Sequence, residues 1–201
     1  SVNVVMKGCN GRGVCEKKLK EVTEKACGRG LVVSDGNCAW GDGKYCRVEM
    51  VEEKPFVIDT AVVALPKSGA KVSGDAHSVA ELSDGRILML LSDGMGSGTA
   101  AAVDSNMTVS LIVKLIEAGV DYTAALKIVN SALLVKSGEE SLSTVDIAAV
   151  NLYTGQAHFY KAGAAPTFIR RGSRTGMVES TSLPAGILTA VEFEKSSVQL
   201  R

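Results

Sequence analysis

The stretch ILMLLSDGMGSG, residues 87–98, joins an apolar segment to an acidic residue and a glycine-rich turn. Ile87 to Leu91 are typical of a strand, and because all five side chains are apolar we expect it to be buried on both faces of a sheet. Asp93 would then stand at the end of this strand, where the sheet holds it rigidly. The glycines that follow allow the backbone to pass close to whatever the carboxylate binds.

A β-hairpin is predicted immediately before this turn. Asp84-Gly85 lies between the runs 78–82 and 87–91, and Asp-Gly between two strands is a strong hairpin signal. Asp84 itself is interpreted as a turn residue. Asp75 precedes the first strand, and in an antiparallel pair the start of one strand lies beside the end of the other. We therefore expect Asp75 to lie beside Asp93, which gives an oxygen-rich site suited to Mg or Mn.

The residues alone leave other interpretations of this turn open. A plain Asp-Gly turn is nearly as well supported as a pair of metal ligands. Three glycines before a helix could also hold a phosphate at the helix N-terminus. However, residues 94–98 lack the Lys-Ser/Thr of a P-loop, and the third glycine comes too early for a dinucleotide-binding fingerprint.

Three further polar residues are weaker candidates. Strand alternation is taken to place His77 on the face opposite to Asp75, which favours a packed or solvent-facing histidine. His158 lies on a strand and has no partner that we can identify. Asp146 could be an outer-shell group, but a strand-end carboxylate bonded to nearby backbone is favoured. No Ser, Cys and His residues form a convincing nucleophilic triad.

The order of elements beyond residue 55 predicts an α+β fold, an antiparallel sheet with helices packed to one side. Apolar residues at helical spacing mark the first helix, and Asp121 can cap the second. The apolar residues in question are Ala100, Val103, Met107, Leu111 and Leu115. The expected elements are a strand at 57–63, the hairpin, helices at 99–118 and 121–135, and strands at 145–152, 157–161, 167–171 and 176–179.

Residues 1–53 form a separate region, and the stretch Glu52-Glu53-Lys54-Pro55 is the best boundary before a second region at 54–201. We expect a strand at 2–6, a helix at 16–26 with Leu19 and Val22 on one side, and a strand at 46–51.

The odd number of cysteines argues against a disulfide framework, and no Cys-x2-Cys spacing suggests a zinc knuckle. Buried small hydrophobic residues are the preferred interpretation. The five are Cys9, Cys15, Cys27, Cys38 and Cys46.

Composition excludes several classes of function. The 22 basic and 22 acidic residues balance, so there is no electrostatic case for nucleic acid, and aromatic residues at 4% argue against base stacking. No run approaches about 18 consecutive apolar residues, so we expect no membrane span. The first six residues also lack the order of a signal peptide.

Several motifs, taken in order, resemble the phosphatase domain of the stage II sporulation protein E family. The resemblance is collinear from about Pro55 to Arg201, and the region before it resembles the segment that precedes the phosphatase in that family. The motifs are Ser73-Gly74-Asp75, residues 92–98 (Ser-Asp-Gly-Met-Gly-Ser-Gly), residues 128–134, Ser143-Thr144-Val145-Asp146, residues 161–169 and residues 183–187.

This resemblance implies a fold and a function. The fold is the PPM-type phosphatase β-sandwich flanked by helices, and the activity is a Mn- or Mg-dependent protein-serine phosphatase with two ions. The implied substrate is a phosphoserine anti-anti-sigma factor, whose dephosphorylation activates a sporulation sigma factor on the cytoplasmic side of the cell membrane. Residues 1–53 would be the tail of the preceding regulatory region. The helices at 99–118 and 121–135 would be regulatory switch helices, through which the protein could form a homodimer.

The resemblance also assigns roles to residues. Asp75 would ligate one metal, Asp93 would bridge both, and the carbonyl of Gly94 would ligate the second, with a bridging water attacking phosphorus in line. The family has later acidic ligands, and this chain ends at Arg201, before the point where they should occur. We therefore expect a C-terminally incomplete domain with little activity. The alternative is a non-catalytic regulatory or self-association fragment.

Overall fold

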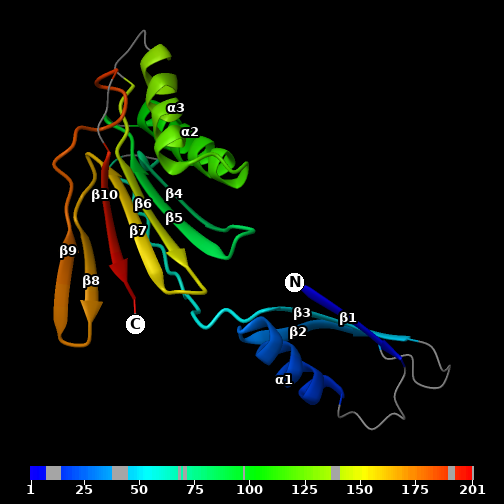
Figure 1. Cartoon of the computed structure of the whole chain (residues 1–201). Helices are drawn as coiled ribbons and strands as arrows, with labels where there is room; N and C mark the ends of the chain where they lie inside the picture. Colours follow the sequence, from blue (N-terminus) through cyan, green and yellow to red (C-terminus); the bar gives the residue numbers. More distant parts are fainter. Residues whose placement is uncertain are drawn as a thin grey trace. The chain divides into compact units, whose positions relative to one another are not determined.

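The computed structural model of the chain (Figure 1) describes residues 1–7, 15–37, 45–67, 69, 72–96, 98–136, 141–189 and 193–200. The chain divides into two compact units, Ser1–Pro55 and Phe56–Arg201. Each unit has its own sheet and its own hydrophobic core.

The first unit is a three-stranded antiparallel sheet with one helix. Its elements are β1 (Val2–Lys7), α1 (Cys15–Cys27), β2 (Leu31–Asn37) and β3 (Tyr45–Glu52), with strand order β1-β3-β2. Leu31, Val48 and Met50 form the core, and Leu19 of α1 packs against it. Val22, one turn later in α1, is 66% exposed.

The cysteines of this unit differ in their surroundings. Cys46 is buried in β3, as the interpretation of cysteines as small hydrophobic residues predicts, whereas Cys27 is exposed at the end of α1. Cys9, Cys38 and the side chain of Cys15 lie outside the described residues.

The second unit is built on a five-stranded antiparallel sheet with strand order β10-β7-β6-β5-β4. Both of its helices lie on one face of this sheet (Figure 1), so the predicted α+β arrangement is confirmed. A separate two-stranded hairpin, β8–β9, follows β7. The elements are β4 (Asp75–Glu81), β5 (Arg86–Asp93), α2 (Thr99–Glu117), α3 (Tyr122–Val135), β6 (Val145–Asn151), β7 (Gln156–Ala162), β8 (Thr167–Arg171), β9 (Arg174–Val178) and β10 (Glu194–Gln199).

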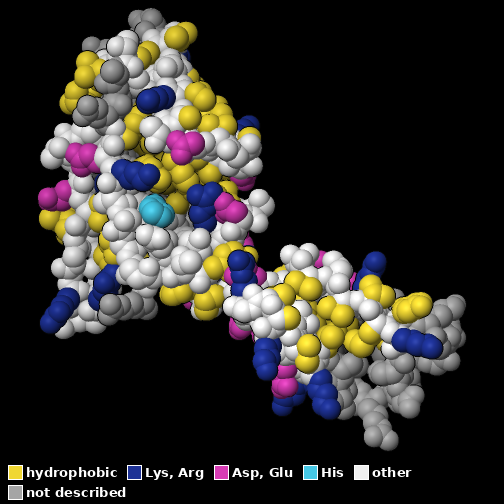
Figure 2. All heavy atoms as spheres, viewed as in Figure 1, with side chains coloured by type: hydrophobic (Ala, Val, Ile, Leu, Met, Phe, Trp, Pro, Cys, Tyr) yellow, Lys and Arg dark blue, Asp and Glu magenta, His cyan; other side chains and the backbone are white. Residues whose placement is uncertain are grey.

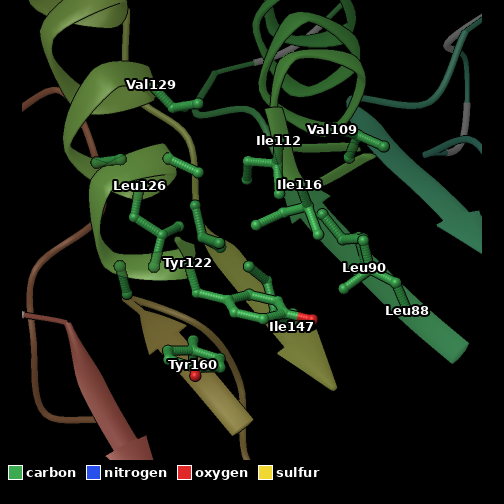
Figure 3. Packing of buried hydrophobic residues seen from close by; sticks show 14 of the residues in the cluster. Leu88, Leu90, Val109, Ile112, Ile116, Tyr122, Leu126, Val129, Ile147 and Tyr160 are labelled. Carbon is green, nitrogen blue, oxygen red and sulfur yellow. The ribbon is translucent and has the colours of Figure 1, made fainter. Parts of the chain in front are cut away.

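The main core lies between the sheet and the two helices (Figure 3). Ile112 and Ile116 of α2 are buried there, with Leu126 and Val129 of α3, so α2 is a core helix although its length and composition would also suit a membrane span. Of the apolar residues that mark this helix in the sequence, Met107, Leu111 and Leu115 are partly buried and pack against the core, whereas Val103 is 49% exposed. The buried residues of α2 are Ala101, Ala102, Asp104, Ser105, Thr108, Val109, Ile112 and Ile116.

The ends of the two helices follow from local sequence. Gly119 has φ +83°, and the Val120 N–H donates to the Leu115 carbonyl at 2.9 Å, which ends α2. The Asp121 carboxylate accepts from the N–H groups of Thr123 and Ala124, at 2.9 and 3.3 Å, so the predicted cap of α3 is confirmed.

Aromatic rings and cations meet at one end of this core. Tyr122 and Tyr160, both labelled in Figure 3, stack with ring centroids 4.7 Å apart. Arg86 lies over the Tyr122 ring and Lys195 over the Tyr160 ring, at 5.2 and 5.3 Å. On the face shown in Figure 2, basic and acidic side chains are interspersed.

The opposite face of the sheet carries a smaller core of Val150, Ala157 and Phe159. Residues from the hairpin β8–β9 and from the segment before β4, including Ile58, pack against it as a partial second layer. This layer leaves Leu91 58% exposed, so the prediction that β5 is buried on both faces is wrong.

Two predictions for the strands also differ from the structure. Residues 57–63 form no strand, and Val57 and Val63 are 85% and 86% exposed. Their alternating pattern resembles a strand, but a strand requires a neighbour to complete the hydrogen-bond ladder. Conversely, β10 was not predicted, because its polar sequence, Glu-Lys-Ser-Ser-Val-Gln, gives little hydrophobic signal at the sheet edge.

Candidate metal centre

The hairpin β4–β5 places Asp75 directly opposite Asp93 in the antiparallel register. Both side chains line a pocket of about 550 Å³, together with Asp146, His77 and residues of the loop after β7. The two carboxylates that the hairpin predicted to be neighbours therefore meet at one end of the sheet. Ser73 Oγ donates to Asp75 Oδ2 at 3.2 Å and fixes the orientation of that carboxylate.

Hydrogen bonds that involve three hydroxyl groups connect the end of β5 to the start of β6. The Asp93 N–H donates to Thr144 Oγ1 at 2.8 Å, and the Asp93 carbonyl accepts from the Thr144 N–H at 2.9 Å. Buried Ser92 donates to the Thr144 carbonyl at 2.7 Å, and its Oγ lies 2.5 Å from Ser143 Oγ. The Ser-Thr of the motif at 143–146 therefore positions Asp93, a role that the sequence analysis missed.

Gly94 is glycine because the backbone of α2 lies against it. A Cβ at this position would lie 2.0 Å from the Ala101 carbonyl oxygen, within the helix backbone. Gly74 is less constrained, since a Cβ there would lie 3.3 Å from the Ala101 Cβ, 3.4 Å from the Gly94 carbonyl oxygen and 3.9 Å from Asp93 Oδ1. The Gly94 carbonyl and the Asp93 carboxylate thus face the same glycine. Ser97, in the same motif, lies outside the described residues.

The site concentrates negative charge. Burial raises the pKa of Asp93, and the neighbouring Asp75 carboxylate raises it further because two like charges repel. A divalent cation between two such carboxylates removes this repulsion, and carboxylate and carbonyl oxygens are the ligands that Mg and Mn prefer.

Asp146 lies on the same face of the sheet but differs from its prediction. The expected bond to nearby backbone is wrong: Asp146 Oδ2 accepts from Lys161 Nζ at 2.6 Å and from Thr167 Oγ1 at 3.2 Å. Lys161 is buried in β7 and was not predicted as a site residue. Lysine side chains are mostly exposed, so no pattern in the sequence indicates the burial of Lys161.

The histidine predictions have different outcomes. The predicted face of His77 is wrong: positions two apart in a strand share a face, so His77 lies on the same side as Asp75 and lines the pocket. Its side chain is exposed, in agreement with the solvent-facing alternative. His158 lies on β7 opposite Ala149, on the face that carries the helices, and its Nδ1 has no hydrogen-bond partner among the described residues. Asp84 is a turn residue as predicted, with Oδ1 accepting from the Arg86 N–H at 3.2 Å.

Asn130 of α3 connects two of the other motifs. Its Oδ1 accepts from the Gly186 N–H at 2.8 Å, and its Nδ2 donates to the Leu188 carbonyl at 2.9 Å. The neighbouring Ala185 N–H donates to the Ser143 carbonyl at 2.9 Å. Residues 185–188 therefore connect α3 to the strand start that holds Asp93.

Replacing Asn130 with alanine is expected to lower the free energy of unfolding by roughly 2–3 kcal/mol, because two backbone groups lose their partner in a buried position. Urea denaturation followed by circular dichroism measures this change. Ser131→Ala is the matched control, since its hydroxyl bonds to the Lys127 carbonyl on the exposed side of α3 and a change within about 0.5 kcal/mol is expected. Equal effects of the two substitutions would contradict the connecting role.

Sequence comparison matches residues 83–201 to the family described as stage II sporulation protein E (SpoIIE). The stage II sporulation protein E of Priestia megaterium is 35% identical over 193 residues, which cover 96% of this chain and 33% of that protein. The chain thus spans about a third of that relative's length.

Solved structures share the fold. The PP2C phosphatase domain of SpoIIE from Bacillus subtilis, solved with a fragment of its regulatory domain, superposes with a TM-score of 0.79 at 29% identity, over 100% of this chain and 59% of that chain. RsbX in complex with magnesium gives a TM-score of 0.57 at 19% identity, over 68% of this chain and 65% of that chain, which indicates a common fold alone. The predicted PPM-type fold is confirmed, and the chain belongs to the stage II sporulation protein E family.

Proposed function

We propose that residues 56–201 carry part of the metal centre of a Mn- or Mg-dependent protein-serine phosphatase. One observation carries the proposal: Asp75 and Asp93 are directly opposite in the hairpin register, with Gly94 next in sequence, at the wall of an open pocket. Homology to the PP2C phosphatase domain supports the same assignment.

The residues present fit a pair of hard divalent cations. Asp75 would ligate one, Asp93 would bridge the two, and the Gly94 carbonyl would ligate the second. When bound, such cations supply Lewis-acid stabilisation of the phosphoryl oxygens and an activated water for in-line attack. The raised pKa of Asp93 in the cation-free protein supports the fit, since a cation relieves the charge repulsion that causes part of it.

The hydroxyl groups of Ser92 and Thr144, which line the pocket, are engaged in structural hydrogen bonds. Ser92 is 3% exposed, and its hydroxyl is bonded to the Thr144 carbonyl. The Thr144 hydroxyl accepts from the Asp93 N–H. Because these hydroxyl groups have structural partners, the attacking oxygen is assigned to water.

The remaining assignments rest on the family. The substrate is proposed to be a phosphoserine anti-anti-sigma factor, and the outcome is activation of a sporulation sigma factor at the cytoplasmic side of the membrane. Residues 1–53 are proposed to be the tail of a regulatory region, with the phosphatase domain from residue 54 onward. Helices α2 and α3 are proposed to act as switch helices, with dimerisation through them. Asn130 supports a connection between α3 and the site.

Phosphate release from a phosphoserine anti-anti-sigma protein tests the proposal. The chain is compared with one extended to the length of its longer relatives, in MnCl2 and in EDTA. We expect release that depends on Mn and is faster in the extended chain, because more acidic ligands bind the metal more tightly. Release that persists in EDTA would exclude a metal centre, and substrate binding without release by either chain would favour the non-catalytic alternative.

A further inference from the structure

A buried ion pair lies beside the same pocket, which its acidic partner Asp146 lines. Lys161 of β7 is 1% exposed, and its Nζ donates to Asp146 Oδ2 at 2.6 Å and to the Ala165 carbonyl at 2.8 Å. Asp146 and Lys161 are also direct cross-strand partners of β6 and β7. The pair therefore joins two strands and the loop after β7, and Ala165 of that loop lines the pocket.

Burying a charged lysine lowers the stability of the fold, so we expect this ion pair to have a function that explains its presence. Taking a charge out of water costs several kcal/mol, and a buried pair often stabilises a fold no better than apolar residues of the same size. Apolar residues pack on this face of the sheet, since Phe159, two positions earlier in β7, belongs to the smaller core. A purely structural account of Lys161 and Asp146 is therefore weak.

Asp146 lines the pocket and has one carboxylate oxygen without a hydrogen bond among the described residues. Within the described part of the chain, Lys161 and Thr167 both bind Oδ2, and no hydrogen bond to Oδ1 is found. Asp146 lines the pocket, and its side chain is 17% exposed. One carboxylate oxygen is thus fixed by the protein while the other can accept hydrogen bonds from the pocket.

The position of Asp146 suits an indirect interaction with the metal centre. It pairs with Leu91, two residues before Asp93 on the same face of the sheet. Such diagonal neighbours lie about 7–8 Å apart, which leaves room for a layer of water. Among the described residues, no three acidic, histidine or cysteine side chains converge to hold one metal ion, which argues against Asp146 as a third direct ligand.

We propose that Asp146 is a positioning residue that accepts hydrogen bonds from water molecules of the metal centre, and that Lys161 fixes its carboxylate in place. The proposal rests on the phosphatase function proposed above and adds two residues to its site. Lys161 also neutralises the charge of Asp146, so that the carboxylate orients water without becoming a competing ligand. Groups that orient ligands of a metal in this way typically contribute 10–100-fold to its affinity.

Isothermal titration of MnCl2 into the protein, with thermal denaturation in EDTA, tests the proposal independently of activity. Asp146→Asn is expected to weaken Mn binding about 10–100-fold. The double substitution D146L/K161M replaces the pair with apolar residues of similar size, which keeps the fold. It is expected to weaken Mn binding to the same extent while the denaturation midpoint in EDTA stays within a few degrees of the unsubstituted protein.

Two control substitutions distinguish a failure of this inference from a failure of the metal-centre assignment. Asp84→Asn, at the far turn of the same hairpin, is expected to leave Mn affinity unchanged. Asp93→Asn is expected to remove Mn binding. If Asp93→Asn removes binding while D146L/K161M binds Mn as tightly as the unsubstituted protein, the pair is only structural and this inference is wrong. If Asp93→Asn binds Mn normally, the metal centre itself is misassigned and the inference fails with it.

Discussion

In the extended chain, Asp93→Asn is expected to lower Mn-dependent phosphate release by at least about 1,000-fold, since the loss of a bridging ligand removes several kcal/mol of charge stabilisation at the transition state. Asparagine has nearly the same size and can keep the backbone bonds to Thr144. The loss is therefore expected to be in metal binding and catalysis and not in folding.

The same substitution is expected to stabilise the metal-free protein at neutral pH. Burial and the Asp75 charge raise the pKa of Asp93 in the folded state, so the folded protein holds this proton more tightly than the unfolded chain. Stability is then lost as the pH rises through the folded-state pKa. Asparagine carries no charge, so the gain in stability of Asp93→Asn over the unsubstituted protein increases from acid to neutral pH.

Thermal denaturation in EDTA between pH 4 and pH 8 measures this effect, and the same scan with saturating MnCl2 provides the comparison. With saturating MnCl2, the unsubstituted protein is expected to be more stable than Asp93→Asn, because it gains binding energy that the variant lacks. A variant that is less stable in EDTA at every pH would show that Asp93 has a structural role and would contradict the metal assignment.

Gly94→Ala is expected to destabilise the protein by about 3 kcal/mol and to lower phosphatase activity by about 100-fold. The added Cβ would lie 2.0 Å from the Ala101 carbonyl oxygen, so α2 or the strand end must move. Such a shift displaces the Gly94 carbonyl from its proposed place at the metal, and misplacement of about 1 Å can cost a factor of about 100 in rate.

Urea denaturation and the phosphate-release assay measure the two effects of Gly94→Ala. Gly176→Ala in β9 is the matched control, because its Cβ would meet only the Ile169 carbonyl, at 3.9 Å. The control is expected to change stability by less than about 1 kcal/mol. Full activity of Gly94→Ala with unchanged stability would show that α2 can move without consequence for the site.

The sequence predicted much of this site because its signals are local. Asp84-Gly85 defines a hairpin turn, and an antiparallel hairpin of fixed register necessarily brings Asp75 opposite Asp93. The cap at Asp121 likewise depends only on residues two and three positions away. Such features need no knowledge of distant parts of the chain, so a single sequence is enough to find them.

The predictions that were wrong used patterns between near neighbours to judge contacts with distant segments of the chain. Residues 57–63 alternate as a strand does, but they have no ladder partner in the structure. The helical spacing in α2 groups Val103 with Met107 and Leu111, but only the last two pack against the core, because the position of the sheet decides which apolar residues are covered. His77 was a simpler error, since strand alternation itself places it with Asp75.

The paired carboxylates, the glycine turn after them and the α+β order of elements could be predicted from the residues alone, because turn chemistry and hydrophobic period act between near neighbours. The structure was needed to show that Lys161 is buried against Asp146, that Asn130 binds residues 186 and 188, and that Leu91 is exposed. Each of these depends on chain segments 15 or more residues apart, or on how much of a sheet face is covered. Packing settles such contacts, and no local pattern encodes them.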